Sequence, residues 1–227
     1  MVFYLTAFHW LEVNVTVPEV WVHCQLDDVI PFCKYAIVPY FAWFAWIPFT
    51  LFYLLRRADR SDFWRVCLCL FAGMTIALAC YVIVPTGLYL RPYRVYGSDI
   101  FARLVRMLYT TDTSMNVCPS IHVFNTVTLM IGYHRSRCFD EPGRRWMRPA
   151  ANVLGVSIIL STMFIKQHSC VDVILGILFG MIMNHIVYHT NFLVKAHGFV
   201  RKLVSNHGNF SPSLSREVHS TSEDAEV

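Results

Sequence analysis

Residues 161–172 read Ser-Thr-Met-Phe-Ile-Lys-Gln-His-Ser-Cys-Val-Asp, and they place ionisable groups at the edge of apolar sequence, where charge is costly. If this stretch is helical, His168 and Asp172 share one face, because they stand one helical turn apart. The carboxylate can then accept a hydrogen bond from one imidazole nitrogen and leave the other as a nucleophile or base. Such a pair taken alone is more often structural, so its meaning depends on its neighbours.

Two further stretches carry polar groups at the ends of apolar runs. Residues 118–122 read Cys-Pro-Ser-Ile-His and stand at the start of an apolar segment. Residues 90–94 read Leu-Arg-Pro-Tyr-Arg and follow another apolar run, where they add fixed positive charge. Together the three stretches supply two histidines, a carboxylate, a hydroxyl group and several cations.

The composition is that of a membrane protein. Of 227 residues, 56% are hydrophobic and 15% are charged, and the formal net charge is +4. The basic residues lie in short loops between apolar runs, which indicates membrane orientation and no nucleic-acid partner. The eight cysteines form no Cys-x-x-Cys pair. Four of them could share one membrane face, which leaves a disulfide there open: Cys24, Cys33, Cys118 and Cys170.

We expect an all-α fold, a polytopic membrane helix bundle of five to six transmembrane helices, because runs of about 20 apolar residues recur. The spans are expected at residues 35–55, 66–84, 119–134, 149–165 and 171–188. The domain organisation expected is a short or truncated N-terminal membrane or interfacial segment at 1–34, a transmembrane domain at 35–192 and a cytoplasmic, largely disordered tail at 193–227.

Two segments outside the spans are expected at the membrane interface. Residues 25–32 read as a loop that keeps its acids in water and its apolar residues against the lipid headgroups. Residues 99–109 have apolar side chains at helical spacing and predict a helix lying in the interface.

Alternation of chain direction decides which loops share a membrane face. The second span ends just before Arg91, the third begins near His122 and the fourth ends near His168, so we expect all three on one face. The basic loops at residues 56–65 and 135–148 then lie on the other face. By the positive-inside rule, the three motifs face the non-cytoplasmic side of a multi-pass protein of the cell membrane.

This set of groups suits cleavage of a phosphate ester at a membrane surface. Phosphoryl transfer needs an in-line nucleophile, an acid for the leaving alkoxide and positive charge around the phosphate oxygens. We expect His168 to attack phosphorus, Asp172 to orient its ring and His122 to protonate the leaving oxygen. A lipid phosphate is the substrate that such a position favours.

The expected phosphate-binding groups are Arg91, Lys166 and Ser120, the last at a helix start where an anion is favoured. No metal or other cofactor is expected. His185 and His189 have the spacing of metal ligands, but no carboxylate or cysteine cluster lies near them in the sequence, so we interpret them as structural. The oligomeric state is left open.

At these three motifs the chain resembles the type 2 phosphatidic acid phosphatase superfamily. That family carries a Lys-x6-Arg-Pro element, a Pro-Ser-Gly-His element and a Ser-Arg-x5-His-x3-Asp element. The matching residues occur in the same order and spacing: Arg91-Pro92, Pro119-Ser120-x-His122, and Ser161-x6-His168-x3-Asp172. The resemblance covers roughly residues 35–188 and implies a catalytic transmembrane domain that forms a phosphohistidine without a metal.

The chain also departs from the family pattern. Val84 stands where the family usually has lysine, Ile121 replaces the glycine and Thr162 replaces the arginine. On a continuous helix Lys166 would lie one turn after Thr162 and could return one of the missing charges, though without the fork geometry of a guanidinium. The bulky residue at the glycine position and the threonine look like the inositol phosphorylceramide synthase branch.

Three functions therefore stay open. The first is a lipid phosphatase or phosphotransferase that cleaves a phosphoester or pyrophosphate of a lipid, with water as the acceptor. The second is an inositol phosphorylceramide synthase-like enzyme that transfers the phosphoryl group to an alcohol. The third, suggested by the two missing cations, is a membrane protein that binds anionic lipid without turnover.

Overall fold

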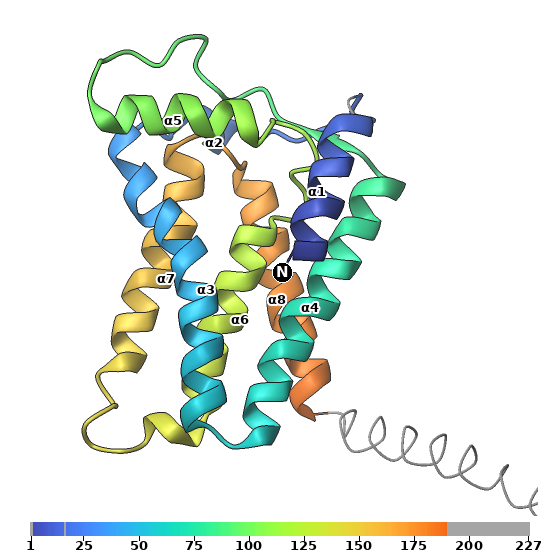
Figure 1. The fold of residues 1–227 in the computed structure, drawn as a ribbon. Coiled ribbons are helices and arrows are strands. Elements are labelled where there is room, and N and C mark those ends of the chain that lie inside the picture. The colour runs from blue at the N-terminus through green and yellow to red at the C-terminus, as the bar shows by residue number, and fades with distance from the viewer. Residues whose placement is uncertain (1, 16, 190–227) are drawn as a thin grey trace, which may run out of the picture. The chain divides into compact units, whose positions relative to one another are not determined.

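The computed structural model describes residues 2–15 and 17–189, so the expected tail at 193–227 lies outside the described residues. Residues 1–185 form one compact unit, and of the second unit, 186–227, only 186–189 are described. The described chain is mostly helical (Figure 1), as predicted. Its α-helices are α1 (Val2–Asn14), α2 (Gln25–Val29), α3 (Ile37–Arg57), α4 (Arg60–Ile83), α5 (Ile100–Thr111), α6 (Ile121–Arg135), α7 (Met147–Phe164) and α8 (Cys170–His189).

Short elements complete the described fold. Two single-turn helices, Lys34–Ala36 and Arg137–Phe139, precede α3 and follow α6. Strand β1 (Val20–Trp21) pairs in parallel with β2 (Thr86–Gly87) and ties the segment after α1 to the segment after α4. Helix α5 confirms the helix predicted at residues 99–109, and Figure 1 shows it lying across the ends of the long helices. Its place at the membrane interface stays a prediction.

Four helices of the described chain are long and apolar enough to cross a membrane: Lys34–Arg57, Arg60–Ile83, Met147–Phe164 and Cys170–His189. They correspond to four of the five predicted spans. The remaining one, α6, has only 15 residues and a rise of about 22 Å, short of the roughly 30 Å hydrocarbon core. The predicted count of five to six spans is therefore not confirmed.

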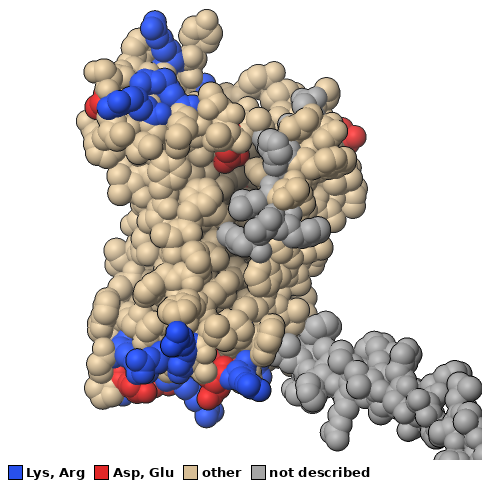
Figure 2. All heavy atoms as spheres, in the orientation of Figure 1, with Lys and Arg blue, Asp and Glu red and all other residues tan. Residues whose placement is uncertain are grey.

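The outer surface of the long helices is apolar. Large hydrophobic side chains such as Phe49 and Phe52 on α3 and Leu178 and Ile182 on α8 are exposed, which suits contact with lipid. In Figure 2, blue and red atoms gather toward the two ends of this face, and the broad band between them shows neither colour. The structure thus presents the apolar belt of a membrane protein.

The short helix α6 is the centre of the bundle and packs against α3, α4, α7 and α8. Its Leu129 and Tyr133 join Leu54 of α3 and Ile158 of α7 in one buried cluster. On another face, Val123 and Val127 pack against Val173 of α8. Because α6 is enclosed by longer helices, its small length does not expose its polar ends to lipid.

The spans predicted to end at residue 165 and to begin at residue 171 agree with the structure, in which α7 ends at Phe164 and α8 begins at Cys170. The condition that residues 161–172 form one helix is therefore not met. One local prediction is wrong: the acids of residues 25–32 are not all in water, since Asp27 is only 2% exposed. The buried Asp27 carboxylate accepts hydrogen bonds from Ser169 and Cys170, where the chain enters α8.

The close approach of α6 and α8 at Gly176 provides a test of this packing. A Cβ atom at Gly176 would lie 2.9 Å from the carbonyl oxygen of Ser120 and 3.0 Å from Cβ of Val123. We expect Gly176→Val to push the two helices apart and to destabilise the protein by roughly 1–3 kcal/mol. Thermal unfolding in detergent measures this.

The matched control is Gly143→Ala, because a Cβ atom there meets nothing within 4 Å. Its melting temperature should equal that of the wild-type protein. A Gly176→Val variant that also melts at the wild-type temperature would contradict the packing described here.

Candidate functional site

The end of α7 fixes the backbone that carries His168. Lys166 has a φ of 56°, in the left-handed region, and its amide donates to the carbonyl of Met163 at 3.0 Å. The next amide, of Gln167, donates to the carbonyl of Thr162 at 2.9 Å, which completes a Schellman motif. The amide of His168 donates to the same Thr162 carbonyl at 3.2 Å. The chain therefore turns sharply and places His168 before the next helix begins.

The start of α8 brings Asp172 against His168. The Ser169 amide donates to Oδ2 of Asp172 at 3.0 Å, and the Ser169 hydroxyl accepts from the Val171 amide at 3.1 Å. This is a capping-box arrangement, with Asp172 as its carboxylate. The same Oδ2 lies 3.3 Å from Nδ1 of His168. The predicted His168–Asp172 pair is thus present, although a helix cap and not a continuous helix forms it.

His122 lies on the first turn of α6 and faces His168. Their ring centroids are 5.7 Å apart. Ser120 caps α6 by accepting the Val123 amide at 3.3 Å, and its own amide donates to the Asp172 carbonyl at 3.4 Å. The α6 start is therefore anchored directly to the α8 start, which sets the spacing of the two rings.

Aromatic side chains of α3 hold the His122 ring. Its centroid lies 4.8 Å from that of Tyr40 and 4.3 Å from that of Trp43. The Phe44 ring stands edge-on at 6.1 Å. This packing fixes the orientation of the imidazole without using its nitrogen atoms.

Both histidines line an apolar cavity of about 330 Å³. Helices α1, α3, α4 and α5 supply most of its wall, through side chains such as Phe8, Phe41, Met74, Leu78 and Met107. Sites of this size and lining are typical of small-molecule pockets. An alkyl chain is the ligand that the wall favours.

Buried polar groups in this wall have no hydrogen-bond partner among the described residues. They are Nε2 of His122, the side-chain amide of Asn116 and Nε1 of Trp43. Asn116 is only 3% exposed. Because a buried polar group without a partner costs free energy, these three groups are suited to bind polar atoms of a ligand.

Arg91 lies beside this site but is bonded to protein oxygens. Its Nη2 donates to the carbonyls of Asp112 at 2.7 Å and Thr113 at 2.6 Å, and also to Oε1 of Gln167. Its guanidinium stands 4.4 Å over the Tyr109 ring. Arg91 does not line the cavity, whereas its partner Gln167 does.

Lys166 points away from the cavity. Its Nζ donates to the carbonyl of Asp27 at 2.7 Å and to that of Ile30 at 2.5 Å, at the end of α2. Ser120, fully buried as the α6 cap, does not line the cavity either. Of the six predicted site residues, the structure brings His122, His168 and Asp172 together. Arg91 does not reach them directly, but it donates a hydrogen bond to Gln167, the residue before His168. Lys166 and Ser120 hold the surrounding backbone instead of facing the cavity.

Several polar residues at the site were not predicted. Nε2 of Gln167 donates to Oδ2 of Asp112 at 3.0 Å, and the Tyr40 hydroxyl donates to the same oxygen at 3.0 Å. These contacts join residues of α3, the α5 end and the α7–α8 turn, so spacing alone does not reveal them. The sequence does carry a signal for the helix start near Asp172, because the Ser-x-x-Asp pattern at 169–172 is typical of a capped helix N-terminus. It carries no such signal for Gln167, Asp112 or Tyr40.

Asp27 is a further residue that was not predicted, and it holds the turn that carries His168 in place. Its carboxylate accepts from the Ser169 hydroxyl at 2.5 Å and from the amides of Cys170 at 2.7 Å and Cys24 at 2.8 Å. Burial alone raises the pKa of this carboxyl, but the three hydrogen bonds outweigh it and hold the pKa below its ordinary value.

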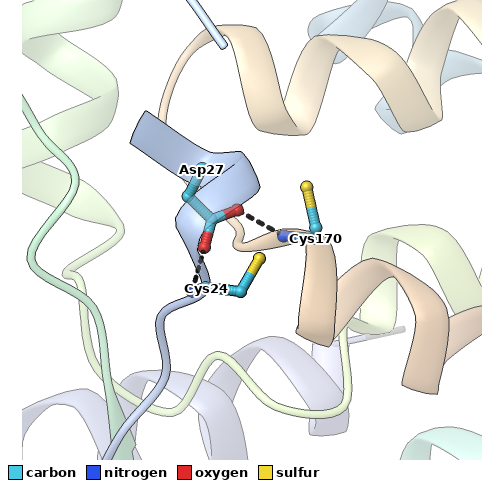
Figure 3. Close-up of side chains that lie close together, drawn as sticks. All are labelled: Cys24, Asp27 and Cys170. Atoms are coloured by element: carbon cyan, nitrogen blue, oxygen red, sulfur yellow. Dashed lines mark hydrogen bonds between the residues drawn. The ribbon is translucent and has the colours of Figure 1, made fainter. Parts of the chain in front are cut away.

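The same place holds one group of possible metal ligands among residues 2–15 and 17–189. The ligand atoms of Cys24, Asp27 and Cys170 lie within 4.8 Å of one another (Figure 3). His185 and His189, interpreted above as structural, do not join it. Neither does either site histidine.

Comparison with known proteins adds no relative. No protein-family model matches the sequence, and no curated protein matches it significantly. The resemblance of the three motifs to a family therefore stays a prediction from their residues.

A pH titration of stability tests the role of Asp27. Its lowered pKa means that the ionised carboxylate stabilises the fold above the ordinary value, about 4, and that this contribution is lost as the pH falls through the folded-state pKa. We expect Asp27→Asn to lower stability by about 1–3 kcal/mol at pH 7 and to differ less from wild type near pH 3.

Asp28→Asn is the control, because Asp28 is exposed and pairs only with exposed His23 in the described contacts. It should follow the wild-type curve. A constant gap between Asp27→Asn and wild type from pH 7 to pH 3 would contradict an ionised clamp.

Proposed function

We propose that this chain is a membrane enzyme that cleaves a phosphoester or pyrophosphate of a lipid through a phosphohistidine intermediate. One observation carries the proposal: two imidazoles with ring centroids 5.7 Å apart, one of them paired with a carboxylate, stand together at the wall of an apolar cavity. A buried histidine pair needs no such cavity to be stable. A lipid phosphate accounts for both features at once.

The proposed first step forms a bond between Nε2 of His168 and phosphorus. Nδ1 of this ring is engaged by Asp172 at 3.3 Å, which leaves Nε2 as the nucleophile and stabilises the imidazolium that forms. The bond from phosphorus to the lipid oxygen breaks as the new bond forms. His122 passes a proton of the substrate's phosphate group to that oxygen; a lipid phosphoester then leaves as an alcohol, and a lipid pyrophosphate leaves as the lipid monophosphate.

The second step regenerates the enzyme. Water attacks the phosphohistidine and gives a proton to His122, the nitrogen–phosphorus bond breaks, and inorganic phosphate leaves. His122 returns this proton to the departing phosphate and is neutral again for the next lipid. The unpartnered amide of Asn116 and Nε1 of Trp43 can donate hydrogen bonds to substrate oxygens during both steps.

The role of Arg91 in this proposal requires an exchange of partners. A phosphate oxygen is a stronger acceptor for a guanidinium than a neutral carbonyl. The proposed complex therefore has Arg91 giving up its bond to Gln167, which lines the cavity, in favour of the phosphate. Lys166 and Ser120 act as positioning residues that hold the His168 turn and the α6 start.

We also propose the membrane orientation. Most of the described arginines outside the helix interiors lie where α3 meets α4 or between the end of α6 and the start of α7, and Figure 1 shows both places at the end of the bundle opposite to α5. The positive-inside rule puts that end in the cytoplasm and the histidine pair on the non-cytoplasmic side of the cell membrane. In this arrangement α6 is a fifth, shorter crossing enclosed by its neighbours.

Phosphate release from lipid phosphates by the purified protein tests the activity. A panel of phosphatidate, sphingoid phosphate and isoprenyl pyrophosphate covers the substrate class. We expect His168→Ala to lower the rate about a thousandfold or more and His122→Ala by about 10²–10⁴-fold.

The control is His185→Ala. This histidine is exposed and lies on α8, roughly 25 Å from His168 at a rise of about 1.5 Å per residue. It should keep wild-type activity. Equal phosphate release from wild type and His168→Ala would contradict the proposal.

One observation favours a second function, binding of a lipid without turnover. No lysine or arginine lines the cavity among the described residues, so an anionic headgroup meets less positive charge there than catalysis of phosphoryl transfer commonly uses. Catalysis and binding alone differ in one species, the phosphohistidine, which only catalysis forms. Mass spectrometry of protein quenched during incubation with lipid phosphate should find a base-stable, acid-labile phosphoryl group on His168, and its absence at saturating lipid would favour binding alone.

A further inference from the structure

Two cysteine sulfur atoms lie next to each other beside the candidate active site. Cys24 precedes α2, and Cys170 is the first residue of α8. Their Sγ atoms lie within 4.8 Å of each other, and Figure 3 shows both side chains extending into the same space near Asp27. The catalytic proposal uses neither thiol.

Asp27 holds the two backbones at this spacing. Its Oδ1 accepts the Cys170 amide at 2.7 Å, and its Oδ2 accepts the Cys24 amide at 2.8 Å (Figure 3). The Ser169 hydroxyl adds a third bond to Oδ2, at 2.5 Å. Because these bonds fix both amides to one carboxylate, the pair of cysteines is rigidly juxtaposed although the residues are far apart in sequence.

The same bonds argue against a metal ion at this place. A carboxylate whose oxygen atoms already accept three hydrogen bonds has few lone pairs left to bind a metal ion. Only two thiols then remain, fewer than the four ligands of a structural zinc site. Two adjacent thiols without a further ligand are the arrangement of a disulfide.

We propose that Cys24 and Cys170 form a disulfide that ties α2 to the start of α8. A disulfide has a sulfur–sulfur distance of about 2.0 Å, so one side chain must change its rotamer. The Cys170 sulfur now contacts Sδ of Met163 at 3.7 Å, a weak contact that such a rotation gives up.

The chemistry is thiol–disulfide exchange. The thiolate of Cys24, the more exposed of the two, attacks a disulfide such as that of glutathione and releases one thiol. The Cys170 thiolate then attacks the Cys24 sulfur of the mixed disulfide and releases the second thiol. Two cysteine thiols are oxidised, one external disulfide is reduced, and the proposed non-cytoplasmic side is where such oxidants act.

Peptide mapping of the full chain in detergent tests the proposal without an activity measurement, so its outcome is separate from that of the phosphatase assay. The protein is equilibrated with oxidised glutathione, its remaining thiols are alkylated, and it is digested without reductant. We expect a cross-linked peptide that joins Cys24 to Cys170 in wild type and that disappears after reduction.

The Cys33→Ser control removes a third, partly buried cysteine of the same region and should leave the cross-link intact. Cys24→Ser should abolish it. Oxidised wild type should also melt about 5 °C or more above reduced wild type, because the bond closes a long loop.

Three results would overturn the proposal. The first is full alkylation of both cysteines after glutathione treatment. The second is a cross-link from Cys24 to Cys33 in place of Cys170. The third is one zinc ion per chain that protects both thiols from alkylation and is lost in Cys24→Ser.

Discussion

The break between α7 and α8 is the constraint on which the candidate site depends. A helix end leaves carbonyl groups without intrahelical partners, and inside a membrane protein they must be bonded. Here the Thr162 carbonyl accepts two amides of the turn, the Phe164 carbonyl accepts the Cys33 amide, and the Ile165 carbonyl accepts the Tyr109 hydroxyl. This hydrogen-bonded turn carries His168 two residues before α8 begins, so the geometry of the turn determines where the imidazole lies.

The positions of the long helices were predictable from the sequence, because an apolar segment inside a membrane must form its backbone hydrogen bonds internally, and a helix does so. Four predicted spans match described helices, and the amphipathic stretch at 99–109 is α5. The spans predicted to end at 165 and to begin at 171 mark the break between α7 and α8, but the left-handed turn at Lys166 was not predictable from hydrophobicity. The buried Asp27 was missed for a related reason: its partners, Ser169 and Cys170, lie at the other end of the chain.

The site divides in the same way. Short motifs and alternating chain direction predicted that three residues share one face: His122, His168 and Asp172. In the structure the two imidazole rings lie next to each other, and Asp172 contacts the ring of His168. The cavity wall and the Gln167–Asp112–Tyr40 contacts were not, because they depend on how α3 and α5 pack over the turn. Lys166 shows the limit of helical spacing, since the left-handed turn sends its amine to α2 and away from the histidines.

The most direct test of the central claim is the structure of the protein with vanadate, an analogue of phosphate that adopts the geometry of the phosphoryl-transfer transition state. The account predicts vanadium bonded to Nε2 of His168, with one of its oxygens within hydrogen-bond distance of Nε2 of His122. Vanadate bound elsewhere on the protein, or at the cavity without contact to both rings, would contradict it.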